Sequence, residues 1–143
     1  MSAVAAMAAV IVASVGQTSP QIPEDAMIPM HAWYSIPAEF TSVERYEQLA
    51  AAGFTHSITG FPTLSAAVEA LDAAEAAGSK IILSCPELFS DTAGAIAVLK
   101  PHPAFAGYNV RDEPAADHFD DLAAMVDLLE ELDPEHPAYI NLY

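Results

Sequence analysis

The segment richest in possible chemistry is GYNVRDEP, residues 107–114, where charged residues directly follow an apolar run. Pro114 cannot extend a strand and fixes the backbone, which would hold Glu113 at the rim of a sheet. Glycoside hydrolysis needs one carboxylic acid to protonate the leaving oxygen, and in retaining enzymes a second carboxylate about 5–5.5 Å away attacks the sugar. In that reading Glu113 donates the proton, and Arg111 and Asp112 contact sugar hydroxyls. The alternative is that Arg111 forms an ion pair at the rim with Asp112 or Glu113.

Apolar runs alternate with stretches of helical periodicity along the chain, and this alternation predicts the elements that position Glu113. Strands are expected over residues 30–34, 54–59, 80–84, 106–110 and 138–142. Helices are expected over residues 41–52, 64–77, 91–100 and 119–131. Strands that alternate with helices through short connections predict right-handed βαβ units and a parallel sheet.

Local signals set the expected helix ends and helix faces. Thr41 and Glu44 have the spacing of a capping box, and Gly53 and Gly78 mark the ends of the first two helices. Asp91 is the expected cap of the third helix. Apolar stripes are expected at Val43, Tyr46 and Leu49 in the first helix and at Phe119, Leu122, Val126 and Leu129 in the last.

Two architectures have alternating strands and helices, and the sequence favours a TIM-type (β/α) barrel over a doubly wound nucleotide-binding sheet. The turn after the first strand, residues 34–39, contains no glycine and therefore no phosphate-binding turn. Strands that begin near residues 30, 54, 80 and 106 are almost evenly spaced, as the equivalent units of a barrel would be. A complete barrel needs roughly 250 residues. Residues 30–143 therefore predict the first four to five βα units, the amino-terminal half of a barrel.

In such a barrel the active site forms where the strands end. We expect that edge to carry an aromatic platform for sugar rings, since aromatic faces pack against pyranose rings. The first expected strand ends with Trp33 and Tyr34, and Asn141 and Tyr143 lie at the end of the fifth. Ordinary packing at the top of the barrel is the alternative role for all four.

The tripeptide 112–114 resembles the Asn-Glu-Pro motif of the clan A glycoside hydrolases, in which the Glu is the acid/base. The longer run 107–114, together with residues 133–143, resembles secreted bacterial barrel proteins of glycoside-hydrolase type. The resemblance extends over about residues 27–143 and implies hydrolysis of O-glycosidic bonds in an oligo- or polysaccharide, without cofactor or metal. It gives the acid/base role to Glu113.

The chain departs from that family in two respects. Asp112 replaces the family's Asn, and an ionised Asp only accepts hydrogen bonds, so the sugar contact made there must differ. The family's nucleophile comes from the seventh strand, which lies beyond the strands expected here. We therefore expect this chain alone to be catalytically incomplete.

Two other kinds of protein fit the same strand ends. A metal-dependent barrel hydrolase or isomerase could gather a divalent ion from His31, His56, Glu87 and Glu113. A non-catalytic carbohydrate-binding half-barrel would keep the aromatic residues without hydrolysis. The single cysteine, Cys85, excludes an intramolecular disulfide or multi-cysteine zinc site, and is better read as a buried thiol than as a nucleophile.

Composition limits the partners. With 20 acidic and 4 basic residues the net charge is −16, which disfavours nucleic acid and anionic membrane surfaces. Residues 1–18 contain a short apolar run followed by small residues, typical of a signal peptide, although no Lys or Arg precedes it. Residues 19–29, with three prolines, are the expected linker. The protein is thus expected to be secreted or periplasmic, without membrane insertion, and a half-barrel with open sheet edges is expected to self-associate.

Overall fold

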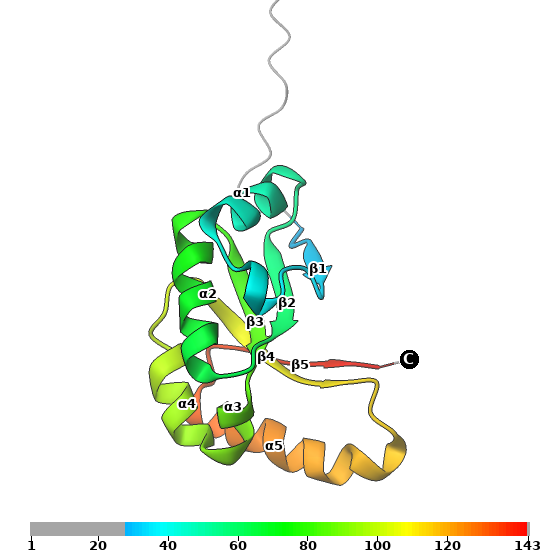
Figure 1. Cartoon of the computed structure of the whole chain (residues 1–143). Coiled ribbons are helices and arrows are strands. Elements are labelled where there is room, and N and C mark those ends of the chain that lie inside the picture. The colour runs from blue at the N-terminus through cyan, green and yellow to red at the C-terminus, as the bar shows by residue number, and fades with distance from the viewer. Residues whose placement is uncertain (1–27, 143) are drawn as a thin grey trace, which may run out of the picture.

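The structure is a computed structural model that describes residues 28–142, and its centre is one five-stranded, all-parallel sheet (Figure 1). The strands lie in chain order: β1 (His31–Trp33), β2 (His56–Gly60), β3 (Lys80–Ser84), β4 (Phe105–Asp112) and β5 (Ala138–Asn141). The expected α/β class and parallel sheet are confirmed. The sheet curls into a half-barrel, and the described residues do not form a closed barrel.

Helices follow the strands in the expected alternation. They are α1 (Val43–Ala51), α2 (Leu64–Ala76), α3 (Pro86–Ser90), α4 (Thr92–Leu99) and α5 (Phe119–Leu132), with short 3-10 turns η2 (Ala38–Phe40) and η3 (Ala116–His118). Helices α1 to α4 gather on one side of the curled sheet and leave the other side open (Figure 1). The expected signal peptide, residues 1–18, and most of the linker lie outside the described residues.

Side-chain caps begin three of the helices. Ser42 and Thr63 accept hydrogen bonds from backbone N–H groups in the first turns of α1 and α2, and Asp91 does the same for α4. The predicted capping box at Thr41 is wrong by one residue, because the hydroxyl of Ser42 makes the contact. Gly53 and Gly78 have the left-handed backbone expected of helix ends, with φ of 92° and 70°.

The two faces of the sheet have different surroundings. Ile81, Leu83 and Tyr108 face the helices and belong to the main hydrophobic core, which is completed by Tyr46 and Leu71. Successive residues of a strand point to opposite faces, so Ile58 and Ile82 lie on the inner, concave face. Both are almost fully buried although no helix covers that face. In the register of the sheet Ile58 pairs with both Trp33 and Ile82.

A buried polar network joins the end of α5 to β4. The Asp133 carboxylate is fully buried, and one of its oxygens accepts hydrogen bonds from the Tyr108 hydroxyl at 2.6 Å and from His136 at 2.8 Å. Lys100 lies 3.5 Å from the other oxygen. These contacts fix the amino-terminal end of β5, because His136 precedes that strand by two residues.

Helix α5 differs from its expected packing. Of the predicted stripe only Leu129 is buried, whereas Phe119 is 49% exposed and Leu122 and Val126 are half-buried. A hollow of about 360 Å³ lies between this stripe and β5, lined by Ile140 and Leu142 among others. The helix therefore packs fully only at its carboxyl-terminal end. No helix within residues 28–142 is both long and apolar enough to cross a membrane.

Candidate active site at the carboxyl edge of the sheet

Two residues at the carboxyl edge have a backbone conformation that non-glycine residues rarely adopt. Tyr34 has φ of 48° and Glu113 has φ of 44°, and within the described part of the chain no other non-glycine residue has positive φ. Each is the residue directly after the end of a strand: Tyr34 follows β1 and Glu113 follows β4. Such conformations cost about 1–3 kcal/mol and cluster at functional sites. Both residues are site residues predicted from the sequence, but only the structure shows the strain of their backbone.

Strands β4 and β5 hold the Glu113 turn together. The Asn141 side-chain amide donates to the Asp112 carboxylate at 2.8 Å, and the Glu113 backbone N–H donates to the Asn141 carbonyl at 2.8 Å. The structure thus brings three of the sequence-predicted site residues together. A carboxylate can accept several hydrogen bonds, and the bond from the Asn141 amide uses only one of these positions. The Asp112 carboxylate can therefore also accept from a ligand hydroxyl.

The ring of Trp33 contacts two other aromatic rings, those of Tyr34 and Tyr139. The rings of Trp33 and Tyr34 lie 5.2 Å apart between centroids, and those of Trp33 and Tyr139 lie 6.0 Å apart. Trp33 is 40% exposed and Tyr34 is 63% exposed. Tyr139 was not among the sequence-predicted site residues, although the alternation within residues 138–142 places it on the same face as Asn141. The predicted Tyr143 lies outside the described residues.

Arg111 lies on the other face of the sheet from this cluster. A register shift between Asn109 and Arg111 pairs Arg111 with Ile140, which packs against the helix-side core. Arg111 accordingly lines a hollow of about 310 Å³ beside α3 and α5, with Phe89 and Leu122 among its neighbours. No ion pair joins Arg111 to an acidic residue within residues 28–142, so the alternative of a rim ion pair is contradicted.

The four residues of the alternative metal centre do not come together. His31 and His56 begin β1 and β2, at the opposite end of the strands from Glu113, and their rings lie 4.9 Å apart. The prediction that both histidines lie at the carboxyl ends of their strands is therefore wrong. Burial lowers the pKa of His56, and His31 and Lys80 lower it further. Glu87 instead accepts a hydrogen bond from the Leu64 N–H at 3.0 Å, which lowers its pKa.

Cys85 is a buried thiol that precedes α3, and burial raises its pKa. A thiol with a raised pKa is a poor nucleophile at neutral pH. This agrees with its predicted structural role.

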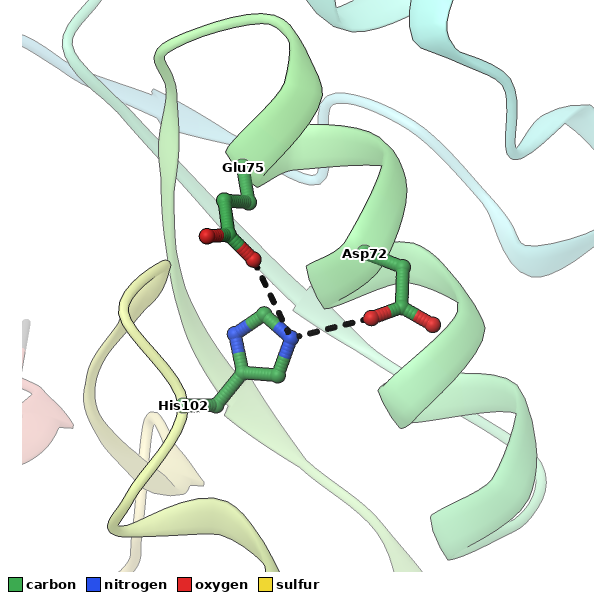
Figure 2. Close-up of side chains that lie close together, drawn as sticks. All are labelled: Asp72, Glu75 and His102. Carbon is green, nitrogen blue, oxygen red and sulfur yellow. Dashed lines mark hydrogen bonds and ion pairs between the residues drawn. The ribbon is translucent and has the colours of Figure 1, made fainter.

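One other cluster contains metal-ligating groups: Asp72 and Glu75 on α2 and His102 before β4 (Figure 2). His102 Nε2 lies 3.2 Å from Asp72 and 3.9 Å from Glu75. The Ala104 backbone N–H donates to His102 Nδ1 at 3.2 Å, so Nδ1 is unprotonated and the hydrogen of a neutral ring must be on Nε2. That nitrogen then donates to Asp72 and has no lone pair for a cation. The cluster therefore links α2 to the segment before β4.

Comparison of the chain with models of protein families, with curated proteins and with solved structures finds no match. The residues of the carboxyl edge and their geometry are accordingly the basis for a functional proposal.

Proposed function

We propose that the carboxyl edge of this half-barrel is part of a glycoside hydrolase site in which Glu113 is the proton donor. The aromatic residues Trp33, Tyr34 and Tyr139 stack against the sugar, and Asp112 and Asn141 contact its hydroxyl groups. The substrate class is an oligo- or polysaccharide with O-glycosidic bonds.

The observation that carries the proposal is the pair of strained residues. Tyr34 and Glu113 both have positive φ, and both stand where parallel strands end, the edge at which barrel enzymes hold their reacting groups. Hydrogen bonds between Asn141 and the 112–113 segment keep the Glu113 turn in this conformation. The fixed backbone limits where the exposed Glu113 carboxyl group can lie, which supports a role in proton transfer to a glycosidic oxygen.

The proposed chemistry is ordinary acid-assisted hydrolysis. The Glu113 carboxyl group donates its proton to the glycosidic oxygen, the bond between that oxygen and the anomeric carbon breaks, and the leaving group departs as an alcohol. Water finally supplies the hydroxyl group of the released sugar and returns a proton to Glu113. The resemblance to clan A enzymes assigns the second carboxylate to a seventh strand, so we assign no nucleophile among the five strands described.

A second candidate function is carbohydrate binding without hydrolysis. The observation that favours it is the exposed aromatic group, since Trp33 and Tyr34 can stack against a sugar whether or not a second carboxylate is present.

Hydrolysis and binding are separated by assaying the full chain with methyl glycosides of glucose, galactose, mannose and xylose, whose leaving alcohol needs the proton of an acid. Because no nucleophile is assigned among the five strands, we expect only slow, acid-assisted turnover of one glycoside, and a loss of about 100-fold in its rate in Glu113→Gln with sugar binding retained. Glu69→Gln, an exposed residue of α2 on the helix side, is the matched control and should behave as the wild type. Sugar binding without turnover would overturn the hydrolase and leave the binding role. Absence of both would overturn both functions.

A further inference from the structure

A hollow with a mostly apolar lining lies on the helix side of the sheet, between α3, the end of β4 and the first two turns of α5 (Figure 1). Its volume of about 310 Å³ is within the size range of sites that bind small molecules. Phe89, Leu122 and Met125 line it together with the buried Val110. The hollow lies on the other face of the sheet from Trp33 and is therefore separate from the proposed sugar site.

Two oppositely charged side chains line this hollow without pairing with each other. Arg111, at the end of β4, contributes a guanidinium group, and Asp121, in the first turn of α5, contributes a carboxylate. Neither forms an ion pair with any residue of the range 28–142. The third polar residue of the lining, His118, has its Nδ1 atom 3.4 Å from Asp117, which lies outside the hollow. The hollow thus offers a ligand one positive and one negative group.

This pair of charges matches a zwitterion better than a simple ion. A guanidinium group binds a carboxylate through two parallel hydrogen bonds, and a carboxylate accepts equally well from an ammonium group. A simple anion would be repelled by Asp121 and by the net charge of −16, and a simple cation would be repelled by Arg111. An α-amino acid carries both charged groups on one carbon atom and has no net charge. An apolar side chain on that atom would leave water for the apolar lining.

We propose that this hollow binds a free α-amino acid with an apolar side chain, such as leucine, methionine or phenylalanine. The ligand carboxylate binds Arg111 and the ligand ammonium group binds Asp121. The ligand side chain lies against Phe89, Leu122 and Met125. The inference does not depend on the proposed hydrolase, because none of these five residues belongs to the sugar site.

Titration of the full chain with amino acids, followed by heteronuclear NMR, measures both affinity and location. We expect saturable shifts of the backbone amides of Phe89, Arg111 and Leu122 with leucine. Glycine lacks the apolar side chain and should bind about tenfold more weakly or worse. N-acetyl-leucine lacks the ammonium group and leucinamide lacks the carboxylate, so each should also lose about tenfold in Kd relative to leucine.

Two variants assign the contacts, and both change exposed side chains, so the fold is retained. Arg111→Gln and Asp121→Asn should each weaken leucine binding about tenfold. Leucinamide has no carboxylate to lose and should bind Arg111→Gln as well as it binds the wild type. Arg45→Gln changes the other arginine of the chain, and Asp120→Asn changes the other acid of the same helical turn. Both lie outside the hollow, and these matched controls should bind leucine like the wild type.

Several results would overturn the inference. Failure of leucine, methionine and phenylalanine to bind at millimolar concentration would do so, as would shifts confined to residues away from the hollow. Unchanged affinity for leucine in Arg111→Gln or in Asp121→Asn would also contradict it. Tighter binding of N-acetyl-leucine than of leucine would show a site for simple carboxylates instead of amino acids. Each of these results would leave the proposed hydrolase site untouched.

Discussion

The indole of Trp33 and the phenol ring of Tyr139 lie 6.0 Å apart at an interplanar angle of 48°, although β1 and β5 are the two outermost strands of the sheet. Three strands separate them in the hydrogen-bonded order, so only strong curling of the sheet can bring the rings together. Trp33 pairs with Ile58, which pairs with Ile82, so the two rings lie on the face where these isoleucines are buried. The ring pair lies across the concave side of the half-barrel.

Replacing Tyr139 by Ala should expose the indole, and the effect can be read directly because Trp33 is the only tryptophan of the chain. We expect a shift of the fluorescence maximum to longer wavelength and a loss of about 1 kcal/mol in the free energy of unfolding. Phe40→Ala, which removes an exposed aromatic ring elsewhere, is the control and should leave the emission unchanged. An unchanged emission in Tyr139→Ala would contradict the curling.

The Asp133 network predicts different effects for two buried tyrosines. Tyr108→Phe removes the hydroxyl that donates to Asp133 and should lower the free energy of unfolding by about 1–3 kcal/mol. Tyr46→Phe removes a buried hydroxyl that has no partner within the described residues, and should be neutral or stabilising. Urea unfolding of both variants measures the difference. Equal losses in the two variants would show that the bond to Asp133 contributes nothing.

The lowered pKa of His56 predicts that the free energy of unfolding decreases as the pH falls below neutrality. Its pKa is lower in the folded chain, chiefly because of burial, so the unfolded chain binds the proton more readily. The contribution of neutral His56 to the free energy of unfolding is therefore complete above pH 6.5, the ordinary pKa of histidine. It is lost as the pH falls from there through the lowered pKa of His56 in the folded chain. His56→Gln should flatten the dependence of the unfolding midpoint on pH between about 7 and 5. A variant with the same slope as the wild type would argue against this role.

The contact between His102 and Asp72 predicts that metal ions do not change the stability of the chain. Zn²⁺ or a chelator should leave the unfolding midpoint unchanged, because the hydrogen bond from Ala104 to Nδ1 places the ring hydrogen on Nε2. Asp72→Asn should cost about 0.5 kcal/mol or less, as expected for a contact to an exposed carboxylate. A rise of the midpoint with Zn²⁺ that His102→Gln abolishes would show that the cluster binds metal after all.

Local patterns alone determined the α/β class, the parallel sheet and most element positions. Residues 80–84 form a strand within the predicted bounds, and Asp91, Gly53 and Gly78 mark the helix ends as expected, because capping and chain reversal depend on neighbouring residues. The prominence of Glu113 likewise followed from its place between an apolar run and a proline.

Tertiary structure decided which of these residues meet. The curl of the sheet brings Tyr139 to Trp33, and the register shift in β4 turns Arg111 to the helix side while Asp112 remains opposite Asn141. His31 and His56 pair at the amino ends of their strands, away from Glu113. Curl and register arise from contacts between strands far apart in the chain, and a shift of one residue reverses the face on which a side chain lies. Sequence periodicity within one strand therefore cannot determine them.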